Sequence, residues 1–182
     1  MKIFYGSAIQ GVADRSTRTH IHDVLIAKLK ALGHSVFSEH LRGNSIEETA
    51  QLLSNSIGEL PPLGIERTRY VRKMMIQALE SDIDVAIFEV SVPSLGTGIE
   101  LAHAYLRPRM GLKPIPVFTL YEKDYWPNNL SSMIRGITEE EFPNFKGAEY
   151  STVEEAASIL EVFLYNIGKF GTSHSAKSLP PY

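Results

Sequence analysis

The stretch DVAIFEVSVPSLGTGIELAHA (84–104) decides the fold of this chain. It opens with an almost continuously apolar run, which is typical of a strand covered on both faces of a parallel sheet. A proline and small residues follow in PSLGTG (93–98), where we expect a loop. Helical spacing resumes in ELAHAYLRP (100–108). A buried strand, a small-residue turn and a helix form the unit from which doubly wound α/β domains are built.

The rest of the chain repeats this alternation of strand and helix. Apolar or alternating segments predict further strands, and apolar positions at helical spacing predict further helices. The expected strands are 2–8, 34–40, 83–90 and 114–121, and the expected helices are 16–33, 45–58, 65–81, 100–108 and 152–168. This pattern predicts an α/β fold with a doubly wound, mainly parallel sheet of about five strands and helices on both faces, Rossmann-like or flavodoxin-like. We expect one domain over residues 1–168 and a C-terminal tail over 169–182.

Composition excludes several classes of protein. The chain has 182 residues, 43% of them hydrophobic, a net charge of −3 and no cysteine. Disulfides, thiolate catalysis and cysteine-bound zinc are therefore excluded. The chain also lacks the excess of basic residues that is typical of proteins that bind nucleic acid polymers, so we expect no such partner. No apolar run is long enough to span a membrane, and the N-terminus lacks a signal-peptide pattern. We expect a cytoplasmic protein with no cofactor and no metal.

Two loops are built for binding a ligand. YGSAIQG (5–11) and PSLGTG (93–98) each follow an expected strand. Ligands of such sheets bind at the carboxyl ends of strands, near the point where the strand order reverses. Small residues let the backbone approach a ligand closely, and the N–H groups of a following helix attract anions. Gly96, Gly98 and the hydroxyl of Ser94 therefore suggest a phosphate site, although a tight turn without a ligand has the same composition.

Glu100 adds a carboxylate to this loop. It is expected in the first turn of the following helix, where the helix dipole favours the ionised form. Such a carboxylate can accept hydrogen bonds from a ligand, or attack an anomeric carbon to form a glycosyl-enzyme intermediate. The alternative is a plain acid that stabilises the start of a helix.

Four stretches resemble one enzyme family. They are FYGSAIQGVADR (4–15), FSEH (37–40), AIFEVSVPSLGTGIELAHA (86–104) and LSSMIRG (130–136). Together they resemble the nucleoside 2-deoxyribosyltransferase superfamily, and most closely its 2'-deoxynucleoside 5'-phosphate N-hydrolases. The resemblance implies hydrolysis of a nucleoside 5'-monophosphate to free base and ribose or deoxyribose 5-phosphate, through a covalent intermediate on Glu100. It also implies a homodimer with shared active sites.

The resemblance assigns substrate-binding roles at matching positions. Ser7, Ser94 and Gly96 match residues that hold the 5'-phosphate. Ser131 matches a serine that reaches into the neighbouring subunit's site, and Met133 lines the pocket. The remaining residues expected to bind substrate are Tyr5, Gly6, His40, Glu89 and Gly98.

The sequence departs from the family pattern at several positions. Ile9 or Gln10 stands where the family has an arginine, which Arg15 or Arg18 can replace. Ile3 takes the place of a tyrosine, for which Tyr5 can substitute. Met75 aligns with an aspartate that orients the sugar and assists proton transfer, and Glu89 and Glu66 are candidate replacements.

Three alternatives remain open from the sequence. The first is a nucleoside deoxyribosyltransferase of the same superfamily. The second is a phosphoribohydrolase of the cytokinin-activating type, which LGTGIE (95–100) resembles locally without the second acid that follows in that pattern. The third is a nucleotide-binding protein that retains the phosphate site but lacks turnover, which Met75 and Ile3 favour. Incubation with each nucleoside 5'-monophosphate, ribo and deoxy, followed by detection of free base, separates the hydrolase from the second and third alternatives.

Overall fold

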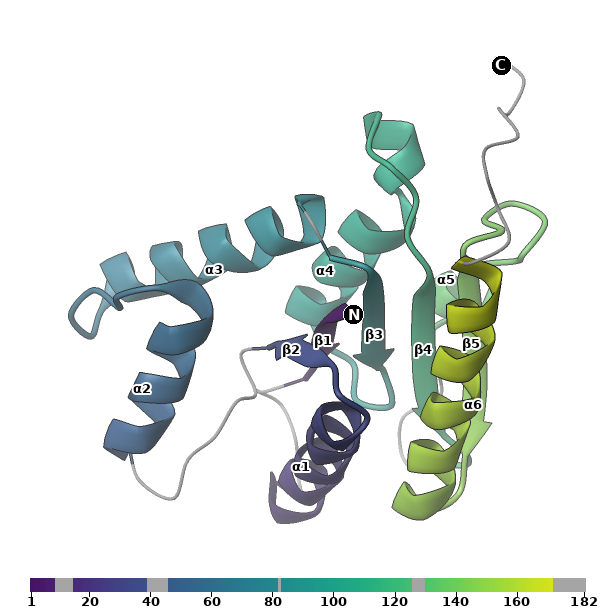
Figure 1. Ribbon diagram of the computed structural model, residues 1–182, viewed down its shortest axis with the longest axis horizontal. Helices are drawn as coiled ribbons and strands as arrows, with labels where there is room; N and C mark the ends of the chain where they lie inside the picture. The colour runs from purple at the N-terminus through teal and green to yellow at the C-terminus, as the bar shows by residue number, and fades with distance from the viewer. Residues whose placement is uncertain (9–14, 39–45, 82, 126–129, 172–182) are drawn as a thin grey trace.

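Five strands form one parallel sheet at the centre of the molecule (Figure 1). The computed structural model describes residues 1–8, 15–38, 46–81, 83–125 and 130–171. In chain order the strands are β1 (Lys2–Ser7), β2 (Ser35–Phe37), β3 (Val85–Glu89), β4 (Val117–Glu122) and β5 (Phe145–Tyr150). Their order across the sheet is β2-β1-β3-β4-β5, and every neighbouring pair is parallel. The predicted α/β fold is confirmed, with the segment 83–90 forming the central strand.

Helices cover both faces of the sheet. In chain order the helices of the described residues are α1 (Arg15–Ala31), α2 (Ile46–Ile57), α3 (Ile65–Glu80), α4 (Leu95–Tyr105), the 3-10 helix η1 (Arg107–Met110), α5 (Ser132–Arg135) and α6 (Val153–Gly171). Successive residues of a strand point to opposite faces. Ile87 packs in the core formed with α1 and α6, and Phe88 packs in the core formed with α3 and α4. The alternation of β3 therefore separates an α1/α6 face from an α3/α4 face.

None of the helices within the described ranges has the length and hydrophobicity that a bilayer crossing requires.

The strand order reverses between β1 and β3. The chain runs outward from β1 to β2, returns to β3 and then continues through β4 to β5. Ser7 and Glu89, the last residues of β1 and β3, are partners in the sheet register. Their carboxyl ends flank the switch point, which is where ligands bind in sheets of this kind. Helix α4 follows β3 directly at this edge (Figure 1).

Helix α4 begins earlier than the sequence predicted. Its N-cap is Ser94, whose Oγ accepts a hydrogen bond from the backbone N–H of Thr97 at 3.3 Å. The expected loop PSLGTG (93–98) therefore lies mostly within the first helical turn, although two glycines weaken helix propensity there. Glu100 consequently lies in the second turn, so its predicted place in the first turn was wrong.

Other boundaries also differ from the predictions. The strand expected at 34–40 covers only Ser35–Phe37, and helix α6 continues to Gly171, past the expected domain end at 168. Residues 172–182 of the expected tail lie outside the described ranges. Strand β5 was not predicted, because Lys146, Gly147 and Glu149 interrupt its apolar pattern.

Candidate active site

The side chain of Glu100 lies on α4 against the end of β1. It is buried, with 9% of the residue exposed. A methyl group at Gly6 would stand 3.1 Å from Oε2 of Glu100 and 2.9 Å from the ring of Phe88. Only a glycine leaves room for the carboxylate to come this close to the strand. The structure thus brings together Gly6 and Glu100, which the sequence analysis placed in one site.

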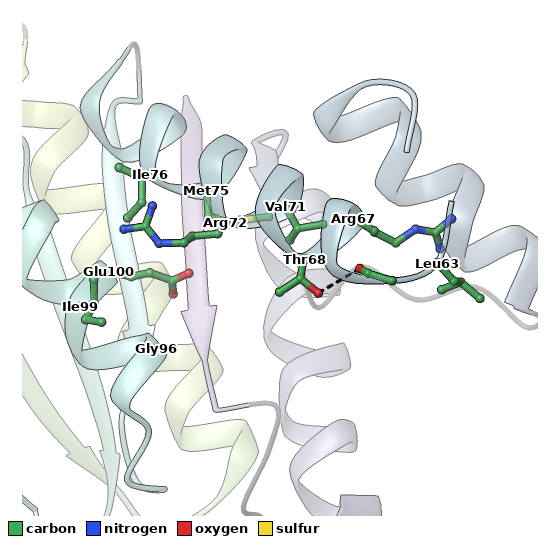
Figure 2. A pocket seen from close by; sticks show the side chains of 11 residues that line it. Leu63, Arg67, Thr68, Val71, Arg72, Met75, Ile76, Gly96, Ile99 and Glu100 are labelled. Atoms are coloured by element: carbon green, nitrogen blue, oxygen red, sulfur yellow. Dashed lines mark hydrogen bonds between the residues drawn. The ribbon is translucent and has the colours of Figure 1, made fainter. Parts of the chain in front are cut away.

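Glu100 opens into a cavity between α3 and α4 (Figure 2). This α3–α4 cavity has a volume of about 630 Å³, which is within the range of small-molecule sites. Most of its wall is apolar. Its lining residues are Leu63, Gly64, Arg67, Thr68, Val71, Arg72, Met75, Ile76, Gly96, Ile99 and Glu100. Met75 is almost fully buried in this wall, so the position aligned with the family aspartate faces the same space as Glu100.

Gly96 and Glu100 share one face of α4. Residues four apart lie above one another on a helix, and both line the α3–α4 cavity. At a rise of 1.5 Å per residue they are separated by ~6 Å along the axis. Gly96 lies in the first turn, where backbone N–H groups point out of the helix. The end of the cavity at Gly96 therefore suits an anion, whereas Glu100, one turn further along α4, presents a carboxylate to the cavity.

A second cavity lies on another side of α4, toward α5. This α4–α5 cavity has a volume of about 420 Å³. It is lined by four of the predicted binding residues, Ser94, Gly98, Ser131 and Met133. Ser131 caps α5 by accepting a hydrogen bond from the N–H of Met133 at 3.3 Å. The structure thus brings these four residues together, but in a different cavity from Glu100.

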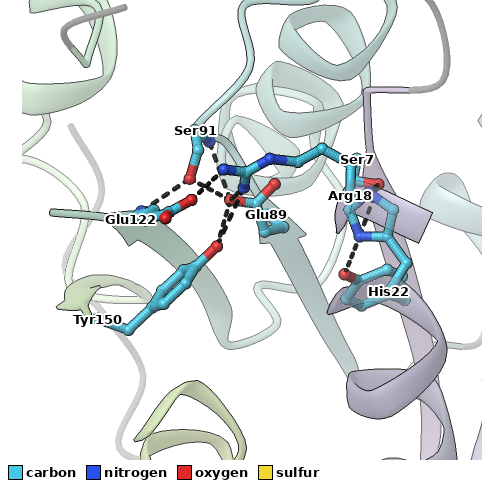
Figure 3. A network of polar contacts seen from close by, with 8 residues as sticks. Ser7, Arg18, His22, Glu89, Ser91, Glu122 and Tyr150 are labelled. Atoms are coloured by element: carbon cyan, nitrogen blue, oxygen red, sulfur yellow. Dashed lines mark hydrogen bonds and ion pairs between the residues drawn. The ribbon is translucent and has the colours of Figure 1, made fainter. Parts of the chain in front are cut away.

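Glu89 lies on the α1/α6 face, in a buried polar cluster at the carboxyl ends of the strands (Figure 3). Its Oε1 accepts hydrogen bonds from the N–H of Ser91 at 3.2 Å, from the hydroxyl of Ser91, and from the hydroxyl of Tyr150 at 3.0 Å. Burial raises the pKa of the Glu89 carboxyl above its ordinary value, against the lowering effects of these donors and of Arg18. Burial and the nearby Glu89 carboxylate also raise the pKa of Tyr150.

Arg18 of α1 connects the acids of this cluster. Its guanidinium lies 3.6 Å from Oε1 of Glu89 and pairs with Glu122 at the end of β4. Burial alone lowers the pKa of Arg18, but the Glu89 carboxylate and the hydrogen bond to Glu122 raise it above its ordinary value. Arg18, which the sequence offered as a replacement for an arginine of the family pattern, thus has two acidic partners within the protein.

Tyr5 and Ser7 point to the same face as Glu89. The hydroxyl of Tyr5 lies 2.9 Å from Nδ1 of His22, and Oγ of Ser7 lies 3.1 Å from Nε2 of that ring. Burial strongly raises the pKa of Tyr5. Gly6 stands between them and faces α4, because side-chain direction alternates along a strand. His40 lies outside the described residues.

Several polar residues at the switch point were not selected from the sequence. His22, Ser91, Glu122 and Tyr150 all belong to the contacts above. One signal was available for Glu122, which directly follows the expected strand 114–121; Tyr150 had none, because its strand was not predicted. Arg72, in the wall of the α3–α4 cavity, had no such signal, because its position depends on how two helices pack.

Comparisons with known proteins agree with this architecture. No family model matches the chain. A protein of Thermofilum pendens (strain DSM 2475 / Hrk 5), provisionally named 2'-deoxynucleoside 5'-phosphate N-hydrolase 1, is 34% identical over 164 residues, which are 90% of this chain and 95% of that protein. Among solved structures, the CMP N-glycosidase BcmB of Clostridium botulinum matches 89% of this chain and 99% of its own, with a TM-score of 0.54 and 18% identity. This second likeness shows a shared fold.

Proposed function

Because the chain belongs to the 2'-deoxynucleoside 5'-phosphate N-hydrolase family, within the nucleoside 2-deoxyribosyltransferase superfamily, we propose that it hydrolyses nucleoside 5'-monophosphates. The protein is an N-glycosidase, an enzyme that cleaves an N-glycosidic bond. The products of the proposed reaction are the free base and ribose or deoxyribose 5-phosphate. Glu100 is the proposed nucleophile.

The arrangement of Gly96 and Glu100 is the observation that carries this proposal. A 5'-phosphate at the N-terminus of α4 would meet backbone N–H groups at Gly96 and the hydroxyl of the N-cap Ser94. The sugar would then run along the helix face, and ~6 Å further on its C1' would lie over Glu100. The apolar walls of the α3–α4 cavity would receive the base.

The proposed chemistry has two steps. A carboxylate oxygen of Glu100 forms a bond to C1' while the bond from C1' to the base breaks, through an oxocarbenium-like transition state. The bonding pair leaves with the base nitrogen. Water then attacks C1' and releases Glu100 as the carboxylate, so the configuration at C1' is retained overall. The proton that this water loses balances the one that the departed base takes up. Binding of the remote phosphate orients the sugar for attack.

Exposed apolar side chains around α4 support the proposed homodimer. Leu95 is 90% exposed, Met133 is 80% exposed, and both line the α4–α5 cavity. Ile99 is 53% exposed beside Glu100. Large apolar side chains that cluster at the surface are typical of a protein interface. Ser131 and Glu100 line different cavities of one chain, so a composite site would combine Ser131 of one subunit with Glu100 of the other.

Replacement of Glu100 tests the proposal. Wild type, Glu100→Gln and Glu100→Ala would be incubated with deoxy- and ribonucleoside 5'-monophosphates, and free base measured by chromatography. Loss of the nucleophile should lower kcat by at least about three orders of magnitude, near 4 kcal/mol, while nucleotide binding persists. Glu154→Gln is the matched control, because Glu154 is an exposed acid in the first turn of α6 and is outside the lining of both cavities. Glu66, a candidate acid from the sequence, is exposed on α3 and also outside the lining of the α3–α4 cavity.

Each result has a distinct meaning. Near wild-type release by Glu100→Ala would exclude Glu100 as the nucleophile. Tight nucleotide binding by wild type without release of base would favour the non-catalytic alternative. Faster release of base when a second free base is added, with that base appearing in a new nucleotide, would favour a deoxyribosyltransferase.

A further inference from the structure

The α3–α4 cavity has an unusual set of charges for a site that expels a base. Within the described part of its lining, the ionisable side chains are Arg67, Arg72 and Glu100. A guanidinium does not give up its proton in proteins. Glu100, as the nucleophile of the proposed function, must be unprotonated. The hydroxyl of Thr68 donates to the carbonyl of Gly64 at 3.3 Å. This part of the lining therefore offers no acid that can protonate a leaving base.

Glu89 does not supply that acid either. Its carboxyl lies on the α1/α6 face, in contact with Ser91, Tyr150 and Arg18, whereas Glu100 lies on the α3/α4 face. Glu89 is absent from the lining of the α3–α4 cavity. The sheet therefore separates the two carboxyl groups.

Arg72 is placed to act on the base in another way. Figure 2 shows its side chain on the Glu100 side of α3, with the guanidinium near the Glu100 carboxylate and Ile76. Met75 and Ile76, three and four residues later, lie on the same helix face and line the same cavity. Arg72 forms no ion pair or hydrogen bond with any residue that the structure describes. By contrast, Arg67 donates to the carbonyl of Pro61 at 2.7 Å, and Arg69 pairs with Glu66 at 2.9 Å.

A cation at this position suits an anionic leaving group. When C1' bonds to Glu100 and the glycosidic bond breaks, both electrons of that bond go to the base nitrogen. Where no acid of the described lining donates a proton, the base departs as an anion, whose charge spreads to its carbonyl oxygens. A guanidinium that donates to such an oxygen stabilises charge that develops only in the transition state. A bound nucleotide also removes water from the cavity, which strengthens the attraction.

We propose that Arg72 binds the departing base and stabilises it as an anion, and that the enzyme therefore prefers nucleotides of pyrimidine-2,4-diones, uracil and thymine, over those of cytosine and adenine. This inference rests on the proposed function. The uracil anion carries its charge on two carbonyl oxygens, one of them next to the glycosidic nitrogen. Cytosine is a much weaker acid at that nitrogen, and adenine has no carbonyl to accept from Arg72. The released anion takes its proton from water.

A leaving-group series tests the proposal in the intact protein. Wild type would be assayed with 5-fluoro-dUMP, dUMP and dTMP, whose bases decrease in acidity in that order, and with dCMP and dAMP. Without an acid catalyst, kcat should rise steeply with the acidity of the base. Release from dCMP and dAMP should be at least about tenfold slower than from dUMP.

Substitution of Arg72 tests whether the positive charge of its side chain stabilises the departing base. Arg72→Gln should lower kcat for the dione series at least about tenfold, with a smaller effect on KM, and should steepen the dependence on base acidity. Arg72→Lys should restore part of the rate. Lys73→Gln is the matched control, since it removes a neighbouring exposed cation that does not line the cavity.

The outcomes separate this inference from the proposed function. If dCMP and dAMP release base as fast as dUMP, or if Arg72→Gln behaves like Lys73→Gln, the role of Arg72 is wrong while the hydrolase proposal stands. If wild type releases base from no nucleotide, the proposed function fails and this inference fails with it.

Discussion

Gly6 of β1 leaves the space that the carboxylate of Glu100 occupies. A Cβ atom at Gly6 would lie 3.1 Å from Oε2 of Glu100, and 2.9 Å from two ring atoms of Phe88. Both distances are short for a carbon contact, and Phe88 is fully buried in the α3/α4 core. A side chain at Gly6 must therefore displace the carboxylate, the ring or the strand. The position of the proposed nucleophile thus depends on a residue that contributes no side chain.

Gly6→Ala should reduce activity by moving Glu100. Overpacking a well-packed region costs about 1–3 kcal/mol, so the free energy of unfolding should fall by a similar amount. The expected result is a kcat at least about tenfold lower in protein that remains folded, because small displacements of a nucleophile are costly. Base release and urea unfolding would be measured on the same preparations.

Gly168→Ala is the matched control for this substitution. Gly168 lies in α6, and no heavy atom lies within 4 Å of a Cβ built there. The control should retain wild-type activity. Full activity of Gly6→Ala would show that the carboxylate tolerates displacement, and would weaken the assignment of Glu100.

Gly98→Ala should separate stability from binding. Gly98 is helical, and a Cβ there meets nothing within 4 Å, so alanine should stabilise α4 by up to ~1 kcal/mol. The new methyl group would nevertheless enter the α4–α5 cavity beside Ser94 and Ser131. In the proposed composite site this cavity meets the nucleotide held by Glu100 of the partner subunit, so we expect a higher melting temperature together with a raised KM for nucleotide. A higher melting temperature with unchanged KM, as expected for Gly168→Ala, would remove Gly98 from the binding site.

The central part of the fold was predictable because it depends on local patterns. The segment 83–90 is apolar on both faces, and only a central parallel strand buries both. Strand β5 lies at the edge of the sheet and carries Lys146 and Glu149, so its apolar pattern is too short to recognise. Helix α4 was predicted to start late, because two glycines obscured the N-cap function of Ser94.

The sequence indicated many of the residues of the candidate site, but it did not indicate which of them contact one another or line the same cavity. Alternation along β1 already implied that Tyr5 and Ser7 face away from Gly6. The contacts that followed were not predictable, since His22 and Arg18 come from a helix whose rotation against the sheet is set by packing. For the same reason, the sequence did not indicate that Arg72 and Glu100 line one cavity.

Glu89→Gln should change how stability depends on pH. Burial raises the pKa of Glu89 in the folded protein above its ordinary value of 4.5. Between 4.5 and the raised value the folded protein binds more protons than the unfolded chain, so this group makes stability fall as pH rises. The variant cannot titrate at this position and should lack that component. Urea unfolding of both proteins, from acid to neutral pH, measures the difference.

The control for this experiment is Glu66→Gln, because Glu66 is exposed and pairs only with the exposed Arg69 among described residues. Its difference from wild type should vary little with pH. Suppose instead that the wild-type protein gains stability relative to Glu89→Gln as pH rises through the same interval. Arg18 and the hydrogen-bond donors would then outweigh burial, and the pKa of Glu89 would be lowered rather than raised in the folded protein.

Mixing two inactive variants should restore activity if the active site is shared between subunits. Ser131 lines the α4–α5 cavity and Glu100 lines the α3–α4 cavity, so we expect the two residues to meet only across a dimer. In a mixture of Glu100→Ala and Ser131→Ala subunits, each heterodimer then has one site with both defects and one intact site. Random exchange should restore about a quarter of the wild-type sites. Base release after co-refolding, with sedimentation to establish the dimer, measures this. No recovery in a mixture with demonstrated subunit exchange would instead place Ser131 and Glu100 in the same subunit's site, and full activity of Ser131→Ala alone would exclude Ser131 from catalysis.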